Sequence, residues 1–116
     1  MSGEKASYIL LGLENQTDIH YAMPVKNMVY DAMQYARQVS EISAGHRRNK
    51  DVGKISSAEF LSGFFREDRL QPVITLVIHF GADPWDGPTS LHEMFSVQDD
   101  VIRRYAQDYR VHLLDP

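Results

Sequence analysis

The sequence predicts one α/β domain covering residues 1–116, with a mixed, mainly parallel sheet of about three strands and one long helix. Three observations carry this prediction. An unbroken apolar run at 8–13 and a β-branched run at 73–80 are typical of strands in a covered sheet. Between them, residues 25–47 repeat apolar side chains at intervals of three and four, which indicates an amphipathic helix.

The first strand is expected at residues 7–14 and is followed at once by polar residues. Glu14 and Gln16 occupy alternate positions, so on a strand their side chains point the same way. Burying a carboxylate beside an amide is costly unless a charged or hydrogen-bonding group meets them. We therefore expect a functional site at this strand end, with a divalent metal ion as the partner of Glu14.

The helix at 25–47 is expected to turn one apolar stripe toward the core. Before it, Asp18 is expected to cap a turn and His20 to lead into the helix with a hydrogen bond, although their spacing alone would also suit metal ligands. The stripe comprises Val25, Met28, Val29, Ala32, Met33, Ala36, Val39 and Ile42.

The second half of the chain is expected to form shorter elements. Ser56 with Glu59, and later Ser90 with Glu93, are spaced as capping boxes that open short helices. Trp85 lies in a loop rich in turn formers and is expected to fold back over the core rather than stack a base. A strand at 73–80, a helical turn at 101–105 and a last strand at 109–114 complete the prediction.

The amino-acid composition excludes some classes of protein. The chain contains no cysteine, which excludes disulfides, and no apolar stretch approaches the roughly 18–20 residues that cross a bilayer. We expect a cytoplasmic protein without a membrane partner. The net charge of −4 argues against a broadly basic nucleic-acid coat.

Basic residues nevertheless gather at 46–54, where Arg47, Arg48, Lys50 and Lys54 stand close together. This group is either a solvated helix end or a contact for phosphates, and the pattern leaves both open. Tyr30, one helical turn after Lys26, is likewise either a phosphate contact or the edge of the core stripe.

Several long phrases resemble one known family. They are GLENQTDIHYAMPVKNMVYDAMQYA at 12–36, EFLSGF at 59–64, PVITLVIHFG at 72–81, PWDGPTSLHEMF at 84–95 and DYRVHLL at 108–114. Together they resemble the recombination-promoting nucleases, also labelled transposases, of the PD-(D/E)XK nuclease superfamily.

The resemblance implies a restriction-endonuclease-like core that hydrolyses DNA with magnesium. By this match Glu14 is a catalytic metal ligand, and Gln16 stands where the superfamily usually has a lysine. Lys26 would then supply the missing positive charge, and Lys26, Tyr30, Arg47, Arg48 and Lys50 would contact DNA. The family's metal-binding aspartate lies on an earlier strand, so the chain is expected to be truncated at its N-terminus.

Two other functions stay open. The chain could be a non-catalytic α/β remnant that acts as an interaction module, forming a homodimer through exposed sheet edges. Alternatively, it could be a regulator that binds DNA through the basic group without cutting it.

Overall fold

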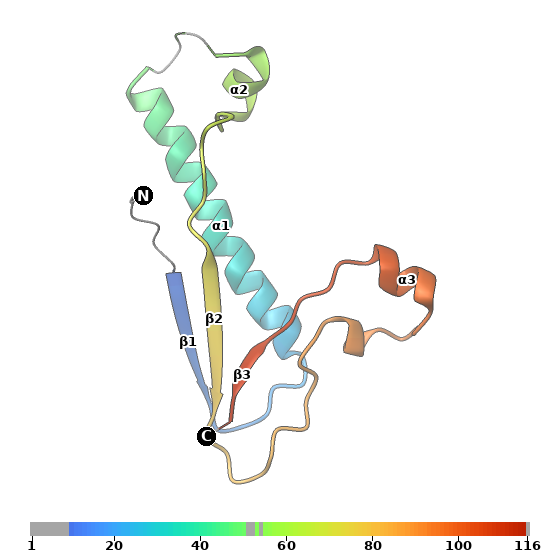
Figure 1. The fold of residues 1–116 in the computed structure, drawn as a ribbon. Helices are drawn as coiled ribbons and strands as arrows, with labels where there is room; N and C mark the ends of the chain where they lie inside the picture. Colours follow the sequence, from blue (N-terminus) through green and yellow to red (C-terminus); the bar gives the residue numbers. More distant parts are fainter. Residues whose placement is uncertain (1–9, 51–52, 54, 116) are drawn as a thin grey trace, which may run out of the picture.

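A computed structural model describes residues 10–50, 53 and 55–115, with strand residues 10–16 described by their backbone. The described chain is α/β, with a long helix packed on a small sheet (Figure 1). The elements in order are β1 (Leu10–Gln16), α1 (Met23–Arg48), α2 (Ser57–Ser62), β2 (Val73–His79), the 3-10 helix η1 (His92–Met94), α3 (Asp100–Tyr105) and β3 (His112–Leu114).

The described sheet has the order β1-β2-β3 and is parallel at both pairings, rather than mixed as predicted. Each connection between strands carries helices that return the chain to the end of the sheet where the previous strand began, which produces parallel neighbours. An isolated bridge between Ser90 and Arg110 is antiparallel but lies outside the strands. Within the described residues, β1 and β3 are therefore the two edges.

Several elements lie where patterns within a few residues of sequence predict them. The long helix was predicted at 25–47 and is found at Met23–Arg48, with Pro24 in its first turn, where its missing N–H costs no helical hydrogen bond. The first predicted capping box is confirmed: the Ser56 hydroxyl accepts from the Glu59 N–H at 3.1 Å, and Glu59 accepts from the Ser56 N–H at 2.9 Å. Gly63 ends this helix with a φ of 72°, which favours glycine.

The second predicted capping box is wrong. The Glu93 carboxylate accepts from the Thr89 N–H at 3.2 Å and from its hydroxyl at 3.3 Å, so it meets Thr89 rather than Ser90. Ser90 is buried and bridges to Arg110, which removes it from the cap position. The turn that follows, at His92–Met94, is 3-10 helical.

The last strand is shorter than predicted, covering His112–Leu114 instead of 109–114. Its expected first half pairs elsewhere: the Val111 N–H donates to the Thr89 carbonyl at 2.7 Å, and the Tyr109 carbonyl accepts from the Leu91 N–H at 2.8 Å. Residues 109–111 are therefore held by the preceding loop and not by β2.

A small apolar core lies between the start of α1 and the middle of the sheet. Met23, Val77 and Val111 form it, and Trp85 and Tyr109 are among the half-buried side chains that pack against it. The prediction that Trp85 folds back over the core is confirmed. Its indole N–H donates to the Gly87 carbonyl at 3.1 Å, which satisfies the one polar atom of the ring.

The predicted core-facing stripe of α1 is largely wrong. Val25, Val29 and Met33 are 38, 51 and 63% exposed, and the buried residues of the helix are Met23, Pro24, Asn27 and Ser43. The helical period of the pattern is confirmed, because Val25, Val29 and Met33 share one face of α1. Val25, Val29 and Met33 are therefore turned to solvent, while Asp31 and Tyr35 hydrogen-bond to β2 from the other side of the helix.

Hydrogen bonds hold α1 to β2. Asp31 accepts from the Thr75 hydroxyl at 2.7 Å and from the Tyr109 hydroxyl at 2.5 Å, which joins the helix to β2 and to the segment just before β3. One turn further, the Tyr35 hydroxyl accepts from the Val73 N–H at 3.0 Å. Burial, together with the hydrogen bond to Asp31, raises the pKa of the Tyr109 hydroxyl well above its ordinary value.

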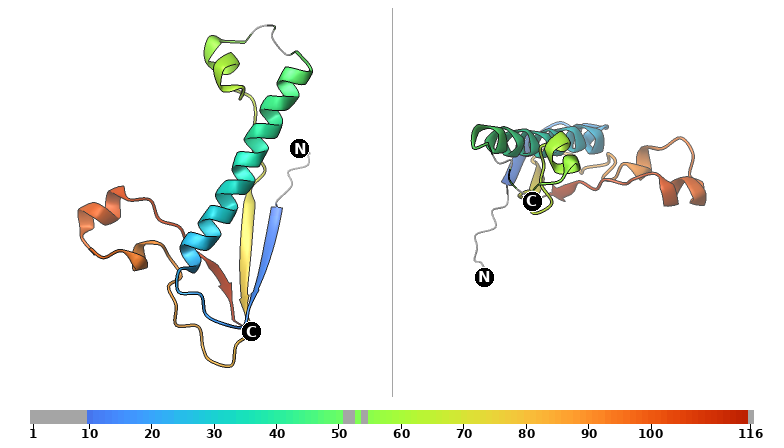
Figure 2. Two further views of the ribbon diagram at one scale, coloured as in Figure 1. Left: turned by 180° about the vertical axis from the view of Figure 1, so that it is seen from behind. Right: turned by 90° about the horizontal axis from the view of Figure 1, so that it is seen from above.

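The other face of the sheet is bare of described elements, as Figure 2 shows from above. Ile74, Leu76 and Ile78 alternate with the helix-facing residues of β2 and are half-buried, and near them Phe80 and Leu114 are 58 and 48% exposed. The molecule is elongated, with extents of 57 × 34 × 26 Å. In the part of the chain that is described, no helix is long and apolar enough to cross a membrane.

Candidate functional site at the carboxyl end of the sheet

The backbone places Glu14 and Gln16 at the end of β1. Glu14 pairs with Val77 and Gln16 with His79 in a continuous parallel register, and β1 ends at Gln16. The prediction that these residues occupy alternate positions at a strand end is thus confirmed for the backbone. Their side chains lie outside the described residues, so their common orientation stays a prediction.

A polar hollow of about 490 Å³ opens beside this strand end. Ligands of parallel α/β sheets bind outside the carboxyl ends of the strands, and the hollow has that position next to β1 and β2. It is lined by Thr17, Asp18, Ile19, Tyr21, His79, Ala82 and Asp83.

His79 is the buried polar group of this hollow, with 2% of its surface exposed. Its Nε2 lies 2.7 Å from the Asp83 carbonyl oxygen. A carbonyl can only accept, so Nε2 carries the proton and Nδ1 keeps its lone pair in the neutral ring. Nδ1 has no hydrogen-bond partner within the described residues. This imidazole nitrogen is therefore a buried hydrogen-bond acceptor without a partner among the described residues.

The sequence analysis missed His79. A signal was present, because buried positions alternate along β2 as Val73, Thr75, Val77 and His79, and the last of these is titratable. The prediction of 73–80 as a β-branched strand did not single out this residue. Its place beside Gln16 depends on the strand register, which a sequence does not specify.

Gly81 permits the close approach that shapes the hollow. A Cβ at this position would lie 2.5 Å from the Thr17 carbonyl oxygen and 2.6 Å from Cε1 of His79. The end of β1 and the loop after β2 therefore come together only because position 81 has no side chain.

The residues between β1 and α1 have different roles. His20 leads into the helix as predicted, and its Nδ1 accepts from the Ala22 N–H at 3.1 Å. Asp18 is exposed and its carboxylate makes no hydrogen bond within the described residues, so the predicted turn cap is not observed. The Tyr21 hydroxyl donates to Asp86 at 2.7 Å, and this bond raises the pKa of Tyr21.

The predicted DNA contacts fall into two groups. Lys26 and Tyr30 are exposed on the first turns of α1, near the end that follows β1. Arg47, Arg48 and Lys50 are exposed at the other end of the helix, roughly 30 Å away at 1.5 Å per residue. The structure therefore does not bring the five residues together.

The side chain of the predicted metal ligand, Glu14, lies outside the described residues. In the described part of the chain, no three acidic or histidine side chains are placed to hold a metal ion. Magnesium requires only one or two protein carboxylates, because water and substrate phosphate complete its octahedron. Asp18 and Asp83 are the acidic residues that line the described hollow next to the end of β1.

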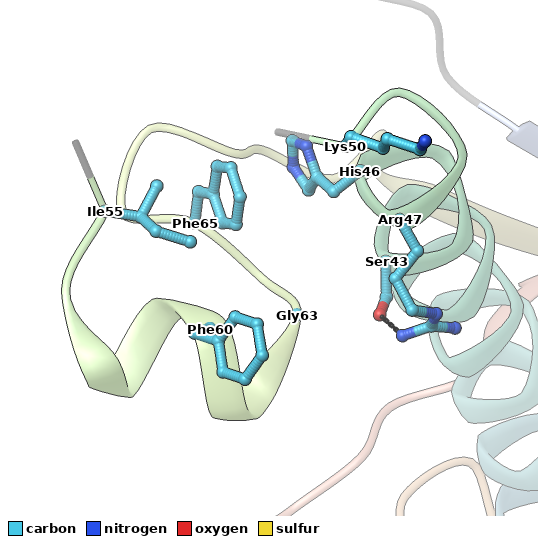
Figure 3. A pocket seen from close by; sticks show the side chains of 8 residues that line it. All are labelled: Ser43, His46, Arg47, Lys50, Ile55, Phe60, Gly63 and Phe65. Atoms are coloured by element: carbon cyan, nitrogen blue, oxygen red, sulfur yellow. Dashed lines mark hydrogen bonds between the residues drawn. The ribbon is translucent and has the colours of Figure 1, made fainter. Parts of the chain in front are cut away.

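A second hollow of about 480 Å³ lies where α2 faces the end of α1 (Figure 3). Ile55, Phe60 and Phe65 form its apolar side, and the α1 side includes His46 and Ser43. It is also lined by Arg47, Lys50 and Gly63.

A ring stack and a hydrogen bond hold His46 on the α1 side of this hollow. The rings of His46 and Phe65 stack with centroids 3.6 Å apart, and Nε2 of His46 lies 2.7 Å from the Asp68 carboxylate. Burial alone would raise the pKa of Asp68, but hydrogen bonds from the Phe65 N–H and His46 outweigh it and lower this pKa. The Asp68 carboxylate therefore already has hydrogen-bond partners. On α1, Nη1 of Arg47 donates to the Ser43 hydroxyl at 2.7 Å.

Comparison with models of protein families, with curated proteins and with solved structures found no significant match.

Proposed function

We propose that the chain is a DNA endonuclease-like domain of a transposase-associated protein, acting with magnesium on phosphodiester bonds. The observation that carries the proposal is the register of β1, which puts Glu14 and Gln16 at alternate positions beside a polar hollow. The sequence phrases that resemble recombination-promoting nucleases support the same conclusion, because they include this strand end and the start of α1. The restriction-endonuclease-like core belongs to this proposal.

Each of the proposed site residues would have a distinct role. Glu14 would hold the cation, the Gln16 amide would orient the attacking water, and the Lys26 ammonium would face the phosphate whose charge increases during attack. Magnesium, when bound, supplies Lewis-acid polarisation of the phosphate and a more acidic bound water. His79 adds a buried imidazole to the lining of the hollow, with its Nε2–H bonded to the Asp83 carbonyl.

The test is cleavage of supercoiled plasmid with and without magnesium, combined with calorimetry of magnesium binding. We expect nicking by the unaltered chain and none by Glu14→Gln, which keeps the size of the side chain but removes its charge. Glu67→Gln is the matched control, because Glu67 is exposed and lies outside the hollow. Equal nicking by Glu14→Gln and the unaltered chain would refute the proposal.

Lys26 can be tested in the same assay. Replacing Lys26 by Ala is expected to lower the nicking rate about 100-fold if its charge stabilises the transition state. Arg37→Ala, an exposed cation further along α1, is the control and should cut normally. Unchanged nicking by Lys26→Ala would remove Lys26 from the site without affecting Glu14.

A second function, a self-associating interaction module, is favoured by one observation. The exposed residues Val25, Val29 and Met33 form an apolar row on α1, and no described element covers the far face of the sheet. Apolar rows of this kind are typical of surfaces that bury themselves against another polypeptide. A second copy of the chain could cover the row of α1 about a two-fold axis, in addition to pairing at the edges of β1 or β3.

Sedimentation measurements decide this second function. The module predicts a dimer at micromolar concentration that Met33→Lys converts to monomer, while Val97→Lys, at a similarly exposed loop position, leaves the dimer intact. A monomeric unaltered chain over the whole concentration range would exclude it.

A further inference from the structure

We infer that the hollow between α2 and the end of α1 binds an unpaired nucleotide of DNA, with its base against Phe60 and Phe65 and its phosphate toward the cations of α1. The inference rests on the proposed function in taking DNA as the ligand. It adds a site about one helix length away from Glu14, and it predicts that the chain prefers single-stranded DNA to an intact duplex.

The apolar side of the hollow has the chemistry of a base-stacking platform. Phe60 is 65% exposed, so its ring is available to a ligand, and Ile55 and Phe65 continue the same wall (Figure 3). Phe65 is already held by its stack on His46, which makes the wall rigid before a ligand arrives. Flat aromatic ligands stack on such walls regardless of base identity.

The opposite side carries positive charge. Arg47 and Lys50 line the hollow, and Arg48 follows on the same exposed helix end. The end of a helix carries only about half a negative charge, so these cations exceed what the helix itself requires. None of the described lining residues is acidic, and two described acids of this region are hydrogen-bonded within the chain, Glu59 in its capping box and Asp68 with His46. A phosphate inside the hollow would therefore meet Arg47 and Lys50 on the lining itself.

Size and shape favour an unpaired nucleotide over a duplex. A volume of about 480 Å³ is within the usual range for pockets that enclose small organic ligands. Bases of an intact duplex are stacked inside the helix and cannot reach a side-chain wall unless they are extruded. Aromatic residues beside cations therefore favour binding of single-stranded DNA, whose bases are already unpaired.

The experiment measures the affinity of a fluorescent twelve-residue thymidine oligonucleotide and of a duplex of equal length, both in EDTA. EDTA removes cleavage, so binding is measured separately from the proposed catalysis. We expect Phe60→Ala to weaken oligonucleotide binding about tenfold. Leu61→Ala is the matched control, because Leu61 lies on the same short helix, is 82% exposed and does not line the hollow. It should change the affinity less than twofold.

A second variant tests the phosphate side. Lys50→Gln should reduce the slope of log affinity against log salt by about 0.7, the value for one lost contact to a single strand. Circular dichroism confirms that each variant is folded.

Three results would overturn the inference: equal effects of Phe60→Ala and Leu61→Ala, equal affinity of the unaltered chain for duplex and single strand, or absence of DNA binding. Normal oligonucleotide binding by Glu14→Gln together with plasmid nicking by that variant would refute the proposed catalytic role while supporting the nucleotide site.

Discussion

The two sides of α1 differ in a way that reverses the usual arrangement of an amphipathic helix. The side that faces the sheet is held by Asp31 and Tyr35 through hydrogen bonds, while the apolar residues Val29 and Met33 on the other side are more than half exposed. An amphipathic helix normally turns its apolar side inward. The difference teaches that hydrophobic periodicity identifies a helix and its faces, but does not identify the element that each face meets.

The largest expected effect comes from breaking the polar side at Asp31. Asp31→Ala removes the acceptor of two hydroxyls, Thr75 at 2.7 Å and Tyr109 at 2.5 Å, and Thr75 is only 2% exposed. Buried donors without partners cost about 1–3 kcal/mol each, so we expect a loss of about 3 kcal/mol in the free energy of unfolding. Urea unfolding followed by circular dichroism measures it.

The control for this variant is Glu41→Ala, an exposed acid on the same helix, which should change stability by less than about 0.5 kcal/mol. If Asp31→Ala were as stable as this control, the hydrogen bonds would not hold the helix to the sheet. The packing of α1 would then have to depend on its few apolar contacts around Met23.

A smaller effect is expected at the C-terminal end of α1. There His46 lies within hydrogen-bond distance of the Asp68 carboxylate. Asp68→Asn weakens the bonds from His46 and the Phe65 N–H, both 2.7 Å long, and should cost about 1 kcal/mol at pH 7. Folding lowers the pKa of Asp68, so its contribution is complete above the unfolded value of about 3.9. It is lost as the pH falls through the folded value.

The unfolding free energies of the unaltered chain and Asp68→Asn should therefore differ at pH 7 and converge in acid. Glu67→Gln, the exposed neighbour, should follow the unaltered chain at every pH. A difference between Asp68→Asn and the unaltered chain that stayed constant down to pH 2 would show that the carboxylate charge contributes nothing.

Signals within a few residues predicted much of this structure. The span of α1 and the capping box of Ser56 and Glu59 depend on local patterns and are found where those patterns place them, whereas β1 ends at Gln16, two residues beyond the predicted end. Trp85 also lies as predicted, because a large apolar ring in a loop gains most by covering the core.

The features that were missed depend on contacts between distant parts of the chain. Asp31 and Tyr109 are 78 residues apart, so no local rule indicates that they share a hydrogen bond. His79 became part of the candidate site only through its register with Gln16, and the bond from Val111 to Thr89 shortened β3 in the same way. Non-local pairing of polar groups decided these points.

The smallest expected effect tests the apolar side of α1. Val29→Ala removes two methyl groups from a side chain that is 51% exposed, and alanine is a better helix former by up to about 0.7 kcal/mol. We therefore expect a change below about 0.5 kcal/mol in the unfolding free energy of a dilute sample. Val77→Ala makes the same chemical change at a fully buried position and should cost about 2 kcal/mol. If Val29→Ala cost as much as Val77→Ala, and did so more strongly at high protein concentration, the outer face of α1 would be buried against a second copy. The contrast between the two sides would then be a property of the single chain and not of its assembled state.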